Sequence, residues 1–446
     1  MTDATSDLPK GTSTTSGHAS LLSETPLMKK RNAAEARFKL YGVVAITVGL
    51  AFLIFLTVSI LRNGIPAFTQ TVVNVEFTLS QEEFDEAESK MLKTAAYTEI
   101  FVNNITAQFQ DRGLDVEFDG GTIERLLGKV GGDLRSFYRE NPDQIGQPVG
   151  FELSTASRVE RYLQGKLTRD MVVDGRFLEA ADLDVVDAMV DAGIIGTAWD
   201  WNFITGTDTG VDNPGGAGIG ASVIGSFFMM LVVLLLSLPI GVAASIYLEE
   251  FAPKNRFTDL IEVNISNLAA VPSIVFGILW LAVFIQFAHL PQSAPLVGGL
   301  VLTLMTLPTI VISTRASLKS VPPSIRDAAL GVGASKMQSV FHHVLPLAMP
   351  GILTGTIIGL AQALGETSPL LLIGMVGYVA REYPDSLTSG LLDPNSAMPA
   401  QIYTWAARSD EAFFEKAWGG IIILFIFLLT MNIIAIILRR RFERRW

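Results

Sequence analysis

Residues 219–248 read IGASVIGSFFMMLVVLLLSLPIGVAASIYL and contain no charged side chain. An α-helix needs about 20 predominantly apolar residues to cross the hydrocarbon core of a bilayer, because each residue adds only about 1.5 Å of rise. This stretch is long enough to cross with some tilt, or to extend out of the bilayer. It therefore predicts a transmembrane helix, and the class of the protein depends on how many similar stretches accompany it.

The composition of the whole chain points the same way. Hydrophobic residues make up 49% of the 446 residues and charged residues only 17%, whereas soluble proteins carry about 25% charged residues. Six long apolar segments lie at 40–61, 219–248, 263–288, 294–313, 344–365 and 417–438. A further apolar piece at 368–379 is too short to cross and is typical of a re-entrant or interfacial segment. We expect an all-α polytopic membrane protein with six transmembrane helices.

The basic residues indicate how these helices are oriented, because loops rich in Lys and Arg stay in the cytoplasm. A basic cluster precedes the first apolar segment, and residues 439–441 after the last one are all arginine. The short loop at 289–294 has no Lys or Arg, whereas the last outer loop carries Arg381 and Arg408 as a weak exception. With six spans, the N-terminus and the C-terminus are then both cytoplasmic.

The chain divides into four parts. Residues 1–39 are polar and rich in Ser, Thr and Lys, and are predicted to be a disordered cytoplasmic tail. Residues 40–62 are the first transmembrane helix. Residues 63–216 form an insert in the first outer loop that is long enough for one domain. Residues 217–446 form a five-helix membrane core, which contains a cytoplasmic loop at about 315–345.

Charge and residue usage exclude several kinds of function. From 76 to 212 the insert holds 27 Asp and Glu residues against 12 Lys and Arg, and the net charge of the chain is −11, which argues against nucleic acid as a partner. The chain has no cysteine, and its four histidines do not cluster beyond His342 and His343, so we expect no metal site. No G-x-x-x-x-G-K-[ST] motif occurs. We expect no catalytic residue and no cofactor.

Local patterns in the insert predict mainly helices. Ser80 and Glu83 have the spacing of a capping box, which marks the start of a helix. Helices are expected at about 81–97, 123–138 and 181–191, and short strands only at 115–118 and 172–173. The insert is therefore predicted to be a small α+β extracytoplasmic domain.

The loop after the fourth span has the most informative local pattern. It reads PPSIRDAALGVGAS over residues 322–335. The two prolines favour a helix start, Gly331 and Gly333 interrupt the helix, and Ser335 with Gln338 forms a capping box for a second one. The pattern predicts two short helices joined by a glycine turn.

This loop resembles the coupling loop of ABC importer permeases, whose pattern is Glu-Ala-Ala, three residues, Gly, nine residues, Ile, one residue and Leu-Pro. The matching positions, at the family spacing, are Asp327, Ala328, Ala329, Gly333, Leu345 and Pro346. Asp327 replaces Glu and keeps its charge, and His343 replaces Ile. The resemblance implies that the loop docks on a separate ATPase subunit and transmits its motion. The alternative is an ordinary helical hairpin.

Further stretches resemble PstA-type permeases of phosphate-specific ABC transporters. They include WNFIT at 201–205, ASVIGS at 221–226 and, most specifically, AQALGETSPL at 361–370. The resemblance covers about 201–441 and leaves out the acidic insert. It implies a non-enzymatic, multi-pass subunit of the bacterial inner membrane that transports phosphate. The implied partners are a second, PstC-type permease, two PstB-type ATPase subunits, a PstS-type phosphate-binding protein outside, and membrane lipid.

Three residues are candidates for the translocation path. Glu366, with Thr367 beside it, follows an uncharged run, and a carboxylate at membrane depth is costly enough to be a functional candidate. Because phosphate is an anion, Glu366 is expected to pair with an arginine or to repel the anion; the alternative is a helix cap at the outer interface. Arg315 closes the fourth span and can hold phosphate in a bidentate fork, or can serve only as a positive anchor.

Small residues form a stripe along the fifth span. Gly351, Gly355 and Gly359 recur every four residues, and such a stripe allows helices to approach closely in lipid. These glycines are predicted to be helix-packing positions, either at a translocation interface or in packing within the chain.

Two other functions remain open on the sequence. The first keeps the permease class and changes the anion to molybdate or sulfate. The second is a membrane sensor that uses the insert as a receptor domain. A sensor needs a cytoplasmic output domain, and the largest internal loop, about 30 residues, is below the usual domain size.

Overall fold

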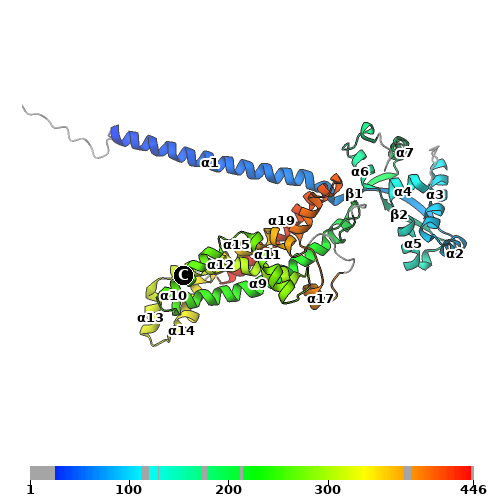
Figure 1. The fold of residues 1–446 in the computed structure, drawn as a ribbon. Coiled ribbons are helices and arrows are strands. Elements are labelled where there is room, and N and C mark those ends of the chain that lie inside the picture. The colour runs from blue at the N-terminus through cyan, green and yellow to red at the C-terminus, as the bar shows by residue number, and fades with distance from the viewer. Residues whose placement is uncertain are drawn as a thin grey trace, which may run out of the picture. The chain divides into compact units, whose positions relative to one another are not determined.

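A computed structural model describes residues 26–111, 120–128, 130–172, 178–210, 214–375 and 383–442. The chain divides into two units, Met1–Ser59 and Ile60–Trp446, which are described separately. Within the described residues, five helices are long and apolar enough to cross a membrane, and a bent pair of helices supplies a sixth span if it is counted as one. The predicted all-α polytopic class is confirmed, and Figure 1 shows the chain coloured along its length.

The first unit consists, where described, of the N-terminal part of α1 (Pro26–Gly64). The helix begins at Pro26 rather than near Leu40, so the basic stretch before the first apolar segment is helical and is not part of a disordered tail. Proline suits the first position of a helix, and Lys39 pairs with Glu35 one turn earlier. Large apolar side chains are exposed along this helix, which suits contact with lipid.

A three-stranded antiparallel sheet lies at the centre of the insert. Its strands, in the order β2-β1-β3, are β2 (Pro148–Ser154), β1 (Thr69–Thr78) and β3 (Ile195–Trp199). On β1, Val73, Val75 and Phe77 are buried while the residues between them are exposed. This alternation is a strand signature. The expectation that short strands lie only at 115–118 and 172–173 is therefore wrong in leaving out β1.

The helices described in the insert are α2 (Gln81–Ser89), α3 (Lys93–Asp111), α4 (Gly120–Leu127), α5 (Val130–Glu140), α6 (Ser157–Leu163) and α7 (Ala180–Asp191), with 3-10 turns η1 (Ile65–Phe68), η2 (Pro142–Gln144) and η3 (Arg169–Val172). The predicted capping box is present, since the Glu83 N–H donates to the Ser80 hydroxyl and the Ser80 N–H donates to the Glu83 carboxylate. The helix predicted over 81–97 is interrupted at 90–92, so it is two helices, α2 and α3.

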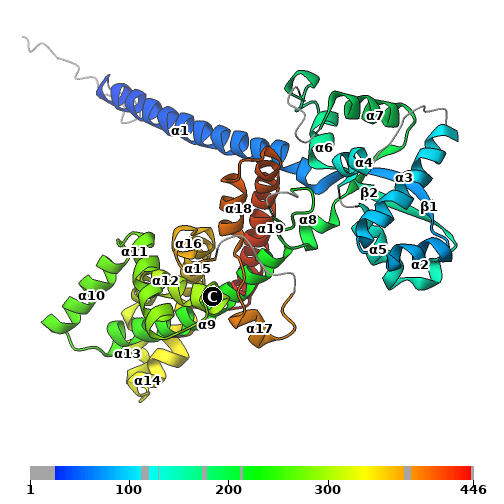
Figure 2. The same cartoon turned by 45° about the vertical axis from the view of Figure 1, so that its right-hand side comes forward.

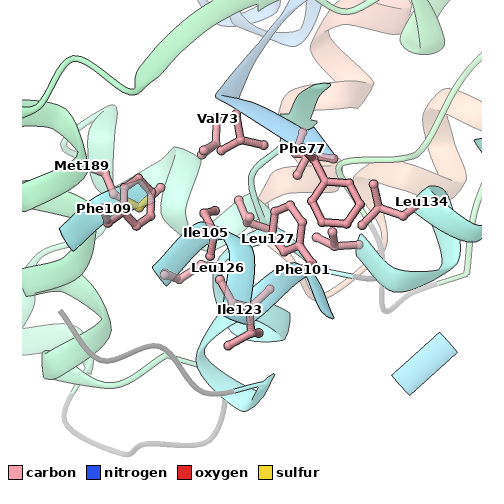
Figure 3. Close-up of a cluster of buried hydrophobic side chains, with 14 of the residues drawn as sticks. Val73, Phe77, Phe101, Ile105, Phe109, Ile123, Leu126, Leu127, Leu134 and Met189 are labelled. Atoms are coloured by element: carbon pink, nitrogen blue, oxygen red, sulfur yellow. The ribbon is translucent and has the colours of Figure 1, made fainter. Parts of the chain in front are cut away.

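The two predicted short strands are not the strands of this sheet. Val172 ends the turn η3, which corrects its assignment to a strand, while Val173 and residues 115–118 lie outside the described residues. The insert is nevertheless α+β, as predicted, because helices and sheet share one core. Side chains such as Phe77 from β1, Phe101 from α3 and Leu126 from α4 meet there, as Figure 3 shows.

The membrane core contains α8 (Trp201–Thr205), α9 (Gly220–Ile246), α10 (Arg256–Leu268), α11 (Ser273–Trp280), α12 (Pro295–Ser320), α13 (Pro323–Gly331), α14 (Lys336–Ser339), α15 (Leu345–Gly365), α16 (Ser368–Leu372), α17 (Leu387–Leu392), α18 (Met398–Ala406) and α19 (Glu411–Phe442). The π-helical segments η4 (Tyr247–Phe251) and η5 (Leu281–Phe287) extend α9 and α11, and η6 (Val340–Val344) leads into α15.

The third predicted span, at 263–288, is not one straight helix. Instead, α10 and the helix formed by α11 with η5 meet at an angle of 102°. Pro272 lies at the break. Proline has no amide hydrogen and disfavours the helical conformation in the residue before it, so the helix cannot continue smoothly through this point.

Helix α12 is the centre of the membrane core. α9 packs along one side of it and α15 along another. The approach of α9 is close, since a Cβ added at Gly299 of α12 would lie 2.5 Å from Cβ of Val232. In Figure 2, α13 and α14 lie at one end of these helices and α18 lies at the other.

Candidate functional site

The α13–α14 hairpin, residues 322–344, is built by local capping signals. Pro323 lies in the first turn of α13, and Ser335 and Gln338 form the predicted capping box of α14. Gly333 connects the helices with φ +88°, a conformation that residues with a side chain rarely adopt. The N–H of Ala334 donates to the Ala329 carbonyl (3.0 Å), which closes the end of α13.

The residues that match the family pattern lie on different sides of this hairpin. Asp327 and Ala328 are exposed, whereas Ala329 is buried against the core. Leu345 and Pro346 begin α15, directly after Val344, which is fully buried beside Leu318 and Ile246 in one cluster. The motif therefore connects an exposed helix to the first turn of a membrane helix.

Large apolar side chains are exposed at the end of the hairpin. We call this surface the hairpin tip, and its members are Leu330, Val332, Met337 and Phe341. Val332 is the most open of them, with 86% of its surface exposed. Apolar side chains gathered on an exposed surface are typical of an interaction site.

Arg326 holds the base of the hairpin. Its guanidinium donates to the Glu250 carboxylate through Nη2 (2.7 Å) and Nε (3.1 Å), and to the carbonyls of Val321 (2.8 Å) and Leu318 (2.9 Å). The Glu250 side chain is only 8% exposed. One arginine thus joins α13, the end of α9 and the end of α12, and forked pairs of this kind fix geometry as well as charge.

Arg315 occupies a second ion-pair network at the same end of the core. It donates to Glu262 of α10 through Nη2 (2.6 Å) and to Glu249 of η4 through Nε (3.3 Å), and Lys319 also pairs with Glu249 (3.5 Å). The Arg315 side chain is 16% exposed. In this structure its charge is satisfied by carboxylates, so it braces three elements instead of presenting an open anion site.

Glu366 and Thr367 lie where the helix is broken between α15 and α16. Both are half-buried, and the Thr367 carbonyl accepts from the N–H groups of Leu370 and Leu371 (3.1 Å each). The Glu366 side chain makes no hydrogen bond or ion pair with any residue in the described ranges. The expected arginine partner is therefore not found among the described residues, where the half-buried carboxylate has no compensating cation.

The path candidates are not brought together. Gly355 of α15 faces Ser313 of α12, which places Arg315 near the first half of α15. Glu366 lies beyond the other end of α15, about 16 Å further along at the rise of an α-helix. Arg315 and Glu366 therefore belong to opposite ends of this helix pair.

The glycine stripe of α15 meets serines of α12. A Cβ added at Gly351 would collide with the Ser317 hydroxyl, and one at Gly355 with the Ser313 hydroxyl. At Gly359 the nearest atom to an added Cβ, Cγ1 of Ile310, is 3.5 Å away, which is an ordinary contact. Two of the three glycines are thus at positions where only a hydrogen fits.

Two buried ion pairs at the other end of the core were not predicted. Arg408 donates to Asp208 through Nη2 (2.6 Å), and Nε1 of Trp405 donates to the same carboxylate (2.8 Å). Lys416 of α19 donates to the fully buried Asp200 (2.6 Å). The Arg408 side chain is 13% exposed, and its charge is paired with a buried carboxylate.

Comparison with known proteins separates the chain into two regions. Residues 237–446 match the model of the family described as "Binding-protein-dependent transport system inner membrane component". Residues 26–172 match a domain of unknown function, DUF3333. The first match includes α1 as well as part of the insert, and residues 173–236 belong to neither match.

Several relatives are similar over the membrane core. "Phosphate transport system permease protein PstA 1" of Mycobacterium tuberculosis is 31% identical over 229 residues, which is 51% of this chain and 72% of that protein. "Phosphate transport system permease protein PstA" of Haemophilus influenzae is 30% identical over 48% of this chain and 73% of that protein. "Probable ABC transporter permease protein YqgI" of Bacillus subtilis is 29% identical over 53% of this chain and 81% of that protein. A solved structure of the MetNI methionine ABC transporter aligns with a TM-score of 0.37 and 16% identity, over 51% of this chain and 95% of that one.

Proposed function

Since the chain belongs to the family of binding-protein-dependent transport system inner membrane components and is an ABC importer permease subunit of the PstA type, we propose that it carries inorganic phosphate across the inner membrane. A permease of this kind performs no covalent chemistry. Its task is to convert the motion of a partner ATPase into alternating access for the anion.

The observation that carries this proposal is the α13–α14 hairpin, with its firm base and its exposed tip. The base is fixed by Arg326 to the ends of α9 and α12, while Val332 and Met337 at the tip are left open. A partner that binds the hairpin tip would therefore move α9 and α12 together. An ordinary surface hairpin needs neither the exposed apolar tip nor the buried ion pair at its base.

We propose the ATPase as the occupant of the hairpin tip. The expected assembly has two PstB-type ATPase subunits on the cytoplasmic side and a second, PstC-type permease. A PstS-type phosphate-binding protein would deliver the anion outside. In this arrangement the hairpin and both termini of the chain are cytoplasmic.

Phosphate is favoured over other oxyanions by the relatives that are named as phosphate transport permeases. We propose that Glu366 and Thr367 lie at the outer part of the path, where an unpaired carboxylate repels anions until the path opens. Arg315 is proposed to take part only when its carboxylate partners Glu249 and Glu262 move away. Molybdate or sulfate is the alternative cargo, and a sensor role is the alternative class.

The proposal is tested by co-purification and uptake. Val332→Asp places a charge at the centre of the hairpin tip, so the ATPase should no longer co-purify and phosphate uptake should fall by at least tenfold. Leu387→Asp, at the exposed Leu387 of α17, is the matched control and should leave both readouts unchanged.

Competition experiments address the cargo separately. Unlabelled phosphate should suppress uptake of labelled phosphate by the wild type, while equal concentrations of molybdate and sulfate should not. Suppression by molybdate or sulfate alone would reassign the anion and keep the permease class. Undiminished ATPase binding by the Val332→Asp protein would remove the hairpin tip as the docking site.

A further inference from the structure

A small cavity lies between α6 of the insert and the first turns of α19. Its volume is about 20 Å³, which is enough for one water molecule. Ser157, Glu160 and Arg161 line it from α6, and Glu415 and Lys416 line it from α19. We call these residues, with the ion pairs around them, the α6–α19 joint.

Three ion pairs surround this cavity. Arg161 pairs with Glu411, Lys166 Nζ lies 2.8 Å from a Glu415 oxygen, and Lys416 Nζ lies 2.6 Å from an Asp200 oxygen. Each of these three cations has its own carboxylate. Glu160 is therefore the one carboxylate of the joint that has no cation in these three pairs.

Glu160 is half-buried at this position. Its side chain makes no hydrogen bond or ion pair with any residue in the described part of the chain. Burial raises the pKa of Glu160 to about 7; the charge of Lys416 opposes this rise, the charges of Glu415 and Asp200 add to it, and that of Lys166 opposes it. The Glu160 carboxyl thus stays protonated at a higher pH than an exposed glutamate does.

Glu415, which also lines this cavity, has an acceptor without a donor. Lys166 donates to Oε2 of Glu415, whereas Oε1 is buried and has no hydrogen-bond partner in the described residues. A buried acceptor without a donor is unfavourable, because it has given up its hydrogen bonds to water without replacing them. The carboxyl of Glu160 lines the same cavity and lacks a partner as well, so one proton between the two groups satisfies both.

We propose that the α6–α19 joint is a proton-binding site, in which protonated Glu160 donates to Oε1 of Glu415, directly or through one water molecule. The bound proton removes the one negative charge of the joint that has no cation, and it thereby stabilises the contact between the insert and α19. This inference concerns the insert, and it stands whether or not phosphate is the cargo.

The sign of the pH effect follows from the direction of the shift. A glutamate released from the joint returns toward its ordinary pKa of 4.5, whereas in the closed joint its pKa is about 7. Binding of the proton to Glu160 therefore stabilises the closed joint, and this stabilisation is complete below about pH 4.5. This support is lost as the pH rises toward about 7, and it stays low above that. The closed-to-open ratio should change by up to about three hundredfold across this window, since the pKa values of the open and closed joint are 4.5 and about 7 and each pKa unit is worth a factor of ten.

Infrared titration tests proton binding directly. The purified full chain in lipid nanodiscs should show a protonated carboxylic acid band that titrates near pH 7. Glu160→Gln should remove this band, whereas Glu152→Gln, at an exposed glutamate on β2, should leave it. Glu415→Gln should lower the midpoint, because it removes a neighbouring negative charge, and this variant serves if Glu160→Gln does not fold.

Thiol labelling tests whether the proton holds the joint closed. The chain has no cysteine, so Ser157→Cys places a single thiol in the cavity lining, and Ser89→Cys places one at an exposed reference position. The labelling rate at 157 relative to 89 should rise between pH 5 and pH 8, and combining Ser157→Cys with Glu160→Gln should abolish the rise.

Three outcomes would overturn the proposal. The first is an acid band that survives Glu160→Gln and Glu415→Gln unchanged. The second is a relative labelling rate that does not vary with pH. The third is a rate that follows sodium concentration at constant pH, which would make the cavity a metal-cation site.

Discussion

The α13–α14 hairpin and the α6–α19 joint are both held by ion pairs, but they differ in what those pairs leave uncovered. At the hairpin, Arg326 and Arg315 are paired with carboxylates at the base, while the apolar tip stays open. At the joint, three direct ion pairs surround a cavity that is large enough for one water molecule, and they leave the Glu160 carboxyl without a cation. The hairpin therefore suits an element that moves when a partner protein binds it, and the joint suits a contact that is already made within the chain.

The comparison shows how the same interaction can serve two purposes. A buried ion pair adds little net stability compared with a well-packed apolar pair, but losing one partner is costly because a charge is left buried. Such pairs therefore fix position more than they add stability. At the hairpin the fixed element is a short helix, and at the joint it is an entire domain.

The largest expected effect is at the ion pair between Lys416 and Asp200. Lys416→Met leaves Asp200 buried and unpaired, so the protein should lose about 3–5 kcal/mol of stability, measured by thermal unfolding in detergent. Adding Asp200→Asn should recover part of the loss, because the amide oxygen still accepts from the Phe203 N–H at the start of α8. No loss in the single variant would mean that the pair does not hold the joint.

Removing the base of the hairpin should have a somewhat smaller effect on stability. Arg326→Ala leaves Glu250 without its partner and should cost about 2–3 kcal/mol, less than a fully buried pair because Arg326 is partly exposed. Uptake should fall while the ATPase still co-purifies, since the hairpin tip is intact. Lys254→Ala, at an exposed lysine nearby, is the control. Normal phosphate uptake by the Arg326→Ala protein would show that the base of the hairpin does not transmit the motion of the ATPase.

Packing between α12 and α15 offers a matched pair of variants. Gly355→Ala forces a methyl group against Ser313, so it should cost about 1–3 kcal/mol. Gly359→Ala adds the same group where space exists and should change stability little. Equal unfolding temperatures for the two variants would contradict the close approach of these helices.

The turn of the hairpin provides a smaller effect with its own control. Gly333→Ala should cost about 1 kcal/mol, because alanine is strained at φ +88°. Gly331→Ala, within α13 and with open space around it, should be neutral or slightly stabilising. Hydrogen exchange of the α13 amides measures both. Similar protection in the two variants would argue against a left-handed residue at 333.

The smallest effect contrasts two carboxyl groups of the insert. Hydrogen bonds from Arg135 and then Lys93 hold the pKa of Glu88 at about 2, below its ordinary 4.5. Because the folded pKa is lowered, this support is present above about pH 4.5 and is lost as the pH falls toward 2. The loss should be about 1 kcal/mol or less and absent in Glu88→Gln. Glu160 has the opposite sign, so acid should weaken the insert at Glu88 while it tightens the α6–α19 joint.

Features that depend on neighbouring residues could be predicted from the sequence. The apolar spans follow from bilayer thickness, and the capping boxes at Ser80 and Ser335 involve residues three positions apart. The hairpin motif likewise lies in one continuous stretch. By contrast, β1 lies outside the predicted strands although Val73, Val75 and Phe77 alternate correctly, and a proline such as Pro272 predicts a kink but not a bend of 102°.

The ion pairs could not have been predicted by any local rule. Arg326 finds Glu250, Arg408 finds Asp208 and Lys416 finds Asp200, and each pair joins elements that are far apart along the chain. No spacing pattern distinguishes these residues from other surface charges. The unpaired state of Glu160 is likewise visible only when all its neighbours are known.

The sequence by itself determined that this protein spans a membrane, carries an acidic insert and presents a helical hairpin of the ABC permease type. These features follow from hydrophobic length, composition and spacings of a few residues. Only the tertiary structure decided which charges are neutralised, where glycines allow helices to touch, and which carboxyl is left over for a proton. Those properties depend on distances between atoms that the folded chain alone brings together.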